Sequence, residues 1–213
     1  MPPARWPIIG VDESGKGDFF GPLVIAGVLT PEGIVPSLLE LGVRDSKTMT
    51  DGRVAVLAER IAQLCLFDVV VINPEKYNQL YRKIRNLNKL LGWGHARVIE
   101  NILLKAPAAT AISDKFGHDR FILDNLQKMG KTIDIIQTVR GEQHPAVAAA
   151  SVMARAEFIR RMESLSGQYD LILPKGASSL VDDAGRKLVK THGLDVLEKV
   201  AKVHFKNFAK ITG

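Results

Sequence analysis

Two apolar runs near the start of the chain constrain its fold more than any other feature. "PIIGVD" at residues 7–12 and "PLVIAGVLT" at residues 22–30 read as buried strands. The segment between them is rich in glycine and short enough to form a turn. We therefore expect the two strands to form a hairpin.

The rest of the chain alternates between strand and helix patterns. Further strands are predicted at residues 67–73, 109–114 and 133–139, and helices at residues 50–64, 74–84, 86–106, 119–130, 144–165, 180–193 and 194–208. This alternation indicates an α/β sheet covered by helices, and the hairpin makes a mixed sheet more probable than a parallel one. No repeat or linker interrupts the sequence. We expect one domain over residues 1–213, with a C-terminal helical part from about residue 175.

Charge and cysteine content narrow the classes of partner and compartment. The net charge is +6 and the pI is about 9.5, which favours a polyanionic partner, although many basic proteins bind no nucleic acid. Cys65 is the only cysteine, so no internal disulfide can form and a cytoplasmic location is expected. No apolar run approaches the roughly 18 residues of a membrane span, and no signal peptide is visible, so we expect no membrane partner.

Four acids lie where predicted strands end. Asp12 and Glu13 close the first run, Asp114 ends a later strand, and Glu142 follows the next one. Functional groups of α/β proteins gather at strand ends, and carboxylates held together repel one another unless a cation neutralises them. Their hard oxygens suit Mg²⁺ or Mn²⁺. Any one of these acids could instead be a turn residue, so the pattern leaves both readings open.

The glycine turn "ESGKGDFFG" is ambiguous when taken alone. It has neither the order of a P-loop nor the spacing of a dinucleotide-binding loop. Its glycines would let backbone amides approach a phosphate or a ribose, with Lys16 adding positive charge. An ordinary hairpin turn explains the spacing equally well.

Several blocks taken together resemble a known family. "GVDESGKGDFFGPLVIAGV" resembles the opening of the type 2 ribonucleases H, and further blocks follow in the family's order over nearly the whole chain: "GVRDSKTMTD", "NPEKYNQLYRKIRNLNKLLGWGHARVIENIL", "AISDKFG", "VAAASVMARAEFI", "LPKGASSLVD" and "HFKN". "GDFFGP", "NLNKLLGWGH" and "DKF" are more similar to ribonuclease HIII than to ribonuclease HII. Ala177 stands where ribonuclease HII usually has a tyrosine that helps to recognise a single ribonucleotide joined to DNA.

The resemblance implies a ribonuclease H-like mixed β-sheet flanked by helices, with a C-terminal helical extension. It also implies an endoribonuclease that cuts the RNA strand of RNA–DNA hybrids with two Mg²⁺ or Mn²⁺ ions, leaving 5′-phosphate and 3′-hydroxyl ends. We expect a monomer. Ribonuclease HIII normally carries an N-terminal domain that grips the hybrid, and we expect this chain to act as the catalytic domain without it.

The resemblance assigns roles to individual positions. The catalytic and metal-binding residues that it implies are Asp12, Glu13, Asp114 and Glu142, the last at a position where ribonuclease HII usually has aspartate. The substrate-binding residues that it implies are Ser14, Gly15, Lys16, Gly17, Ser46, Lys47 and Ser151. The Gly15–Gly17 turn would sense the ribose 2′-hydroxyl. His95 would serve packing or the substrate groove.

Two alternatives to this function remain open. One is incision at single ribonucleotides in duplex DNA, as in ribonuclease HII. The other is a hybrid-binding module without catalysis, which the intact acids argue against because negative charge opposes phosphate binding.

The lysine-rich C-terminus also permits two interpretations. Its lysines Lys199, Lys202, Lys206 and Lys210 alternate with apolar residues, as on an amphipathic basic helix. Such a helix either contacts substrate phosphates or is simply solvated.

Overall fold

The computed structural model describes residues 4–43 and 49–213, and these form two compact units. Unit 1 comprises Met1–Glu13, Ile25–Val70 and Asn86–Ala156, and unit 2 comprises Ser14–Val24, Val71–Arg85 and Glu157–Gly213. Ser46 and Lys47, two of the substrate-binding candidates, lie outside the described residues. That residues 1–213 act as a single domain stays a prediction.

The predicted mixed sheet is confirmed. Its five strands follow the order β3-β2-β1-β4-β5, and their bounds are β1 Ile8–Ser14, β2 Leu23–Thr30, β3 Leu66–Ile72, β4 Thr110–Asp114 and β5 Asp134–Thr138. β4 pairs in parallel with both β1 and β5. Each strand coincides with a predicted one to within two or three residues. The first strand is longer at its end than predicted, because it continues through Asp12 and Glu13 to Ser14.

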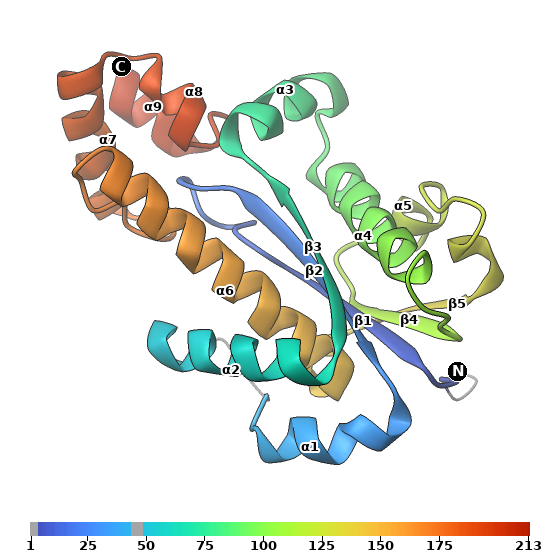
Figure 1. Cartoon of the computed structure of the whole chain (residues 1–213). Coiled ribbons are helices and arrows are strands. Elements are labelled where there is room, and N and C mark those ends of the chain that lie inside the picture. The colour runs from blue at the N-terminus through green and yellow to red at the C-terminus, as the bar shows by residue number, and fades with distance from the viewer. Residues whose placement is uncertain (1–3, 44–48) are drawn as a thin grey trace. The chain divides into compact units, whose positions relative to one another are not determined.

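Helices flank the sheet in unit 1, with α4 on one side and α2 on the other (Figure 1). The helices of this unit are α1 Val35–Glu40, α2 Asp51–Leu64, α4 Leu87–Leu103, α5 Arg120–Leu123 and the first half of α6 Pro145–Gln168. Two strand glycines permit close packing of these helices. A Cβ at Gly10 of β1 would collide with the backbone of Ala146 in α6, and one at Gly27 of β2 would collide with Val98 in α4.

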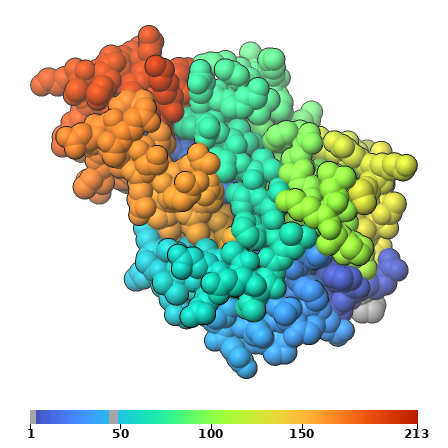
Figure 2. All heavy atoms as spheres, viewed as in Figure 1, coloured from blue at the N-terminus to red at the C-terminus, as the bar shows by residue number. Residues whose placement is uncertain are grey.

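Helix α2 illustrates why these segments fold as predicted. The side chain of Thr50 accepts a hydrogen bond from the N–H of Arg53, which caps the helix start as expected. Val54, Leu57 and Ile61 recur at helical spacing and are all buried. Most other positions of α2 are exposed, and the helix lies at the surface in the cyan part of Figure 2. Burial of one apolar stripe is therefore what holds this helix in place.

The helix predicted at residues 119–130 is much shorter in the structure, where α5 ends at Leu123. The carboxylate of the buried Glu100 accepts hydrogen bonds from the N–H groups of Gln127 and Gly130, at 2.6 and 2.9 Å. These bonds fold the backbone around Glu100 and compete with helical hydrogen bonding.

Unit 2 contains α3 Pro74–Ile84, the second half of α6, α7 Ser179–His192, α8 Val196–Val200 and α9 Lys206–Thr212. The single helix predicted at residues 194–208 is wrong, since α8 and α9 are separate. Between them Ala201 forms a β-bridge with Phe20, and the N–H of Lys202 donates to the carbonyl of Phe19 at 2.8 Å. The chain is extended there because it pairs with the segment that follows the glycine turn.

None of the helices within residues 4–43 and 49–213 is both long and apolar enough to cross a membrane.

Candidate active site

Strand pairing brings two of the predicted acids to the same edge of the unit 1 sheet. β1 and β4 run parallel with Val11 opposite Ser113, so the next residues along the two strands are Asp12 and Asp114. Neighbouring strands lie about 4.8 Å apart, which places the two acidic residues side by side. This register is the main structural support for a shared site.

Glu142 approaches the same edge through the turn that follows β5. The N–H of Gly141 donates to the Asp114 carboxylate at 3.0 Å, and a Cβ at Gly141 would lie 2.8 Å from the Asp114 Cα. Arg140, just before it, adopts a left-handed conformation with φ of 58°. Glu142 lies in the short 3₁₀ helix η4 Gly141–Gln143 and is partly exposed. The turn therefore brings the backbone of the fourth acid next to Asp114.

Glu13 is held by a buried histidine. The Nε2 of His95 lies 3.1 Å from a carboxylate oxygen of Glu13, and the His95 side chain is fully buried in α4. An ionised carboxylate only accepts hydrogen bonds, so the proton of this bond lies on Nε2. The Phe116 ring packs against the imidazole at 4.8 Å between centroids. His95 is therefore a positioning group for Glu13, a role that its place in "GWGH" did not reveal.

The carboxyl group of Asp12 has a raised pKa. Loss of hydration on burial, followed by the charge of Glu13, raises the pKa of Asp12 to about 6. A hydrogen bond from the buried Ser151 opposes this shift. Two adjacent carboxylates with one kept from water favour a compensating positive charge. Ser151, predicted to bind substrate, thus contacts a catalytic candidate.

These residues fit a hard divalent cation by donor chemistry and by charge. As they stand, no three His, Cys, Asp or Glu side chains of the described part of the chain are grouped closely enough to hold a metal ion. Glu13 is hydrogen-bonded to His95, and the Asp114 carboxylate accepts a hydrogen bond from the N–H of Gly141.

The raised pKa of Asp12 predicts that asparagine at this position stabilises the metal-free protein. Because the folded-state pKa lies above the unfolded value, ionised Asp12 lowers stability fully above pH 6 and not at all below about pH 3.8. Asp12→Asn should therefore raise the free energy of unfolding by about 2 kcal/mol at pH 8, with the gain disappearing near pH 3. Urea unfolding in EDTA at both pH values measures this. An equal effect at the two pH values would contradict the assigned cause.

The glycine turn belongs to unit 2 and follows Glu13 directly along the chain. Gly15 is buried with φ of 85°, and a Cβ there would lie 2.9 Å from the Phe158 ring and closer still to the carbonyl oxygen of Pro22. Gly17 is exposed, and no atom of residues 4–43 or 49–213 lies within 4 Å of the position a Cβ would take. The turn is thus packed at Gly15 and open at Gly17. Ser14 and Lys16, the other candidates here, are partly exposed.

The loop that contains Ala177 is hydrogen-bonded to the end of this turn. The N–H of Gly176 donates to the Asp18 carboxylate at 2.6 Å, and the N–H of Phe19 donates to the carbonyl of Gly176 at 2.9 Å. The side chain of Asn207 donates to the carbonyl of Ala177 at 3.1 Å and to Asp182. Position 177, which resemblance linked to substrate choice, therefore lies beside the glycine turn.

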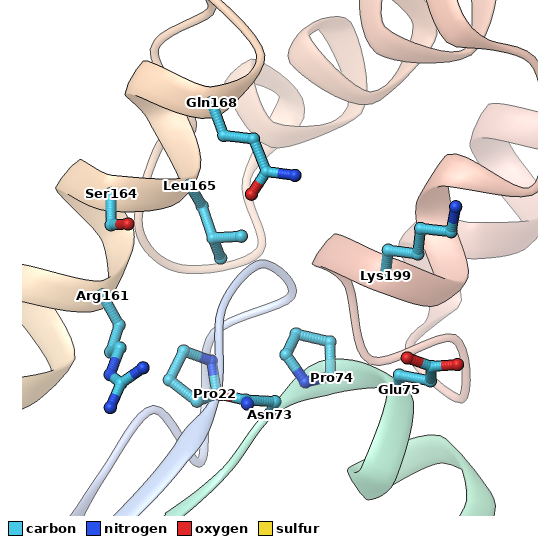
Figure 3. A pocket seen from close by; sticks show the side chains of 9 residues that line it. All are labelled: Pro22, Asn73, Pro74, Glu75, Arg161, Ser164, Leu165, Gln168 and Lys199. Carbon is cyan, nitrogen blue, oxygen red and sulfur yellow. The ribbon is translucent and has the colours of Figure 1, made fainter.

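The C-terminal lysines do not form one basic face. Lys202 is fully buried, so neither of the two interpretations left open, phosphate contact or solvation, holds for this lysine. Lys199, Lys206 and Lys210 are exposed. Lys199 lines a pocket of about 270 Å³ in unit 2, together with Pro22, Glu75, Arg161 and Leu165 (Figure 3). Acidic and basic side chains both line it, so its charge favours no single class of ligand.

A mixed sheet flanked by helices, with acids at the ends of adjacent parallel strands, matches the ribonuclease H-like fold of solved ribonuclease HIII structures. A sequence model of the ribonuclease HII family matches residues 9–208. Ribonuclease HIII of Chlamydia pneumoniae is 48% identical over 208 residues, covering 96% of this chain and 70% of that protein. Ribonuclease HIII of Protochlamydia amoebophila is 44% identical over 207 residues, covering 97% and 69%. The crystal structure of Bst-RNase HIII in complex with Mn²⁺ has a TM-score of 0.90 and 32% identity, covering 96% of this chain and 68% of that one.

The chain belongs to the type 2 ribonuclease H family and, within it, to ribonuclease HIII. It is an endoribonuclease that hydrolyses the RNA strand of RNA–DNA hybrids, and its cofactor is Mg²⁺ or Mn²⁺. The resemblance stated from sequence is thereby confirmed for family, fold and activity.

Proposed function

We propose that hydrolysis takes place at the strand-end carboxylates of unit 1, with Asp12 as the central residue. The observation that carries this proposal is the parallel register that sets Asp12 beside Asp114. Asp12, Glu13, Asp114 and Glu142 would hold two Mg²⁺ or Mn²⁺ ions, which supply a water nucleophile and charge stabilisation at the scissile phosphate and the leaving 3′ oxygen. The products would carry 5′-phosphate and 3′-hydroxyl ends.

Each acid would contribute in a different way. Asp12 is the candidate to contact both ions, because burial and the charge of Glu13 already make its negative charge unfavourable without a cation. His95 would fix one oxygen of Glu13 and leave the other for an ion. Asp114 and Glu142 would contribute from the adjacent strand end and the turn beside it. All four positions remain proposals.

The glycine turn would test the sugar of the strand to be cut. Its open position at Gly17 leaves the backbone free of side-chain cover, which supports close approach to a ribose 2′-hydroxyl. Lys16 would add a phosphate contact. Ser14 and Gly15, which precede Lys16 in the chain, and Ser151, which lies beside Asp12, would also bind substrate. Ser46 and Lys47 remain candidates for phosphate binding from sequence alone.

We predict that the protein cuts long hybrids and largely ignores one ribonucleotide in duplex DNA. Ala177 offers no ring to pack against such a junction, and its loop lies beside the turn. The ratio of kcat/KM for a hybrid over a single-ribonucleotide duplex should exceed about 100, which corresponds to the loss of one well-packed aromatic contact with its hydrogen bond. Initial rates on both substrates measure it. A ratio near one would move the assignment to incision of the ribonuclease HII type.

We also propose that the chain acts as a monomer in the cytoplasm. A chain with one cysteine, the buried Cys65, does not depend on disulfides, which suits a reducing compartment. A solution mass near 23.4 kDa by light scattering is the corresponding check on the monomer.

A further inference from the structure

Lys202 is a fully buried lysine, and each hydrogen bond that its ammonium group forms within the described residues goes to a backbone carbonyl. Its Nζ donates to the carbonyls of Asp18 at 2.8 Å and Gly21 at 2.7 Å, with a longer contact to Phe20 at 3.4 Å. An ammonium has three N–H donors, so these three carbonyls can use all of them. The Tyr77 ring lies 5.8 Å from Nζ. The side chain is therefore fully engaged with one stretch of backbone.

Burying this charge is costly, which indicates that the contact has a specific role. Loss of hydration lowers the pKa of Lys202 to about 7, and the Asp18 carboxylate only partly opposes the shift. A methionine of similar length would avoid the cost and pack as well in an apolar interior. A buried lysine is thus a poor choice for packing alone.

The three carbonyls explain what the ammonium does. Residues 18–21 follow the glycine turn, and the N–H groups of Asp18, Phe19 and Gly21 bond to other carbonyls. The N–H of Phe19 bonds to Gly176 and that of Gly21 to Val200. The Phe19 and Phe20 side chains are fully buried on either side. Without Lys202 the carbonyls of Asp18, Phe20 and Gly21 would point together into the interior without this donor, which is unfavourable by repulsion and by lost hydrogen bonds.

This segment fixes the glycine turn from behind. The N–H of Asp18 closes the turn on the carbonyl of Gly15 at 3.4 Å, and a Cβ at Gly15 would collide with Phe158 and Pro22. Asp18 is anchored twice, by its carbonyl on Lys202 and by its carboxylate on Gly176. The hydrogen bonds of Lys202 therefore fix the segment that directly follows the exposed Gly17.

We propose that Lys202 is a positioning residue for substrate recognition, which holds residues 18–21 so that the Gly15–Gly17 turn is presented to the sugar of the strand to be cut. This inference rests on the proposed role of the turn. It gives the C-terminal segment between α8 and α9 a part in distinguishing ribose from deoxyribose, although no atom of Lys202 contacts substrate.

The test compares Lys202→Met with Lys187→Met, a control at an exposed lysine of α7 outside this cluster. Amide hydrogen exchange is followed over residues 14–21 and over α7, and kcat and KM are measured on a long hybrid. In Lys202→Met we expect exchange of the turn to rise about tenfold or more relative to α7, and kcat/KM to fall about 10- to 100-fold, mainly through KM. Mn²⁺ affinity, measured by calorimetry, should stay within about twofold because the acids of unit 1 are unchanged.

Chemical rescue separates the ammonium from simple packing. Lys202→Cys in a Cys65→Ala background is alkylated while unfolded and then refolded, either to S-aminoethylcysteine, which restores the ammonium, or to S-propylcysteine, which has the same length without it. The first should regain most of the turn's protection and KM, and the second should resemble Lys202→Met. If methionine prevents folding, Lys202→Gln, with two N–H donors, should show an intermediate effect.

Equal behaviour of the two alkylated proteins, or an increase in exchange spread evenly over unit 2, would overturn the proposal and leave Lys202 a packing residue. Failure of the underlying function would be recognised separately in the unmodified protein, as absence of any preference for a ribonucleotide strand. In that case hydrogen exchange alone still decides whether Lys202 holds the turn.

Discussion

Asp12→Asn should lower the rate of hybrid cleavage by at least about a thousandfold in Mg²⁺, with hybrid affinity unchanged within a few-fold. Asparagine keeps the shape of aspartate but removes the negative charge that a cation requires. The large effect follows from the position of Asp12 beside both Glu13 and Asp114, where the loss of one carboxylate would affect the whole proposed metal site. Single-turnover rates and binding in Ca²⁺ or EDTA separate chemistry from affinity.

Asp124→Asn is the matched control for this substitution. Asp124 is an exposed acid of unit 1 at the end of α5, so the same chemical change there should leave the rate unaltered. Asp114→Asn should resemble Asp12→Asn. If the cleavage rate of Asp12→Asn were within tenfold of that of the unmodified protein, these carboxylates would have no essential part in the reaction.

Gly15→Ala should lower the stability of the protein, whereas Gly17→Ala should weaken its binding of the hybrid, although the two glycines lie only two residues apart. At Gly15 a methyl group would meet the Pro22 carbonyl and the Phe158 ring, in a backbone conformation with φ of 85°. We expect a loss of about 3 kcal/mol or more in the free energy of unfolding, from backbone strain and steric overlap together. At Gly17 the methyl group would meet no protein atom, so stability should change by less than about 0.5 kcal/mol.

Cleavage then distinguishes a structural turn from one that reads substrate. Gly17→Ala should raise KM for the hybrid about tenfold or more, because its methyl group would occupy the space needed by the ribose. Thermal or urea unfolding and steady-state kinetics on both variants measure the two effects. A stable Gly17→Ala protein with unchanged KM would show that the turn does not approach the substrate.

Much of the fold was predictable because its strands are short apolar runs bounded by residues typical of turns. The five strands and the capped helix α2 could be predicted from local pattern alone. The helices at residues 119–130 and 194–208 were overestimated because distant residues decide them. Glu100 accepts a hydrogen bond from the backbone of Gly130, and the pairing of Ala201 with Phe20 keeps the chain extended between α8 and α9. Helical periodicity carries no information about such partners.

The acids were predictable and their supports were not. Asp12 and Asp114 follow apolar runs, and strand pairing then brings them together. His95 sits in a helix whose sequence gives no sign that its imidazole faces Glu13. Lys202 was misassigned for a related reason, because a lysine in an alternating basic stretch resembles a solvated one until a distant turn supplies its acceptors. Contacts between residues 82 or more positions apart leave no local pattern.

Cleavage mapping on a long RNA–DNA hybrid, with each strand end-labelled in turn, tests the central claim most directly. In Mg²⁺ the RNA strand should be cut at many internal positions, leaving 3′-hydroxyl and 5′-phosphate ends, while the DNA strand stays intact and EDTA stops the reaction. Cutting of the DNA strand, cyclic phosphate ends, or cleavage that persists in EDTA would contradict hydrolysis at a cation held by Asp12, Glu13, Asp114 and Glu142.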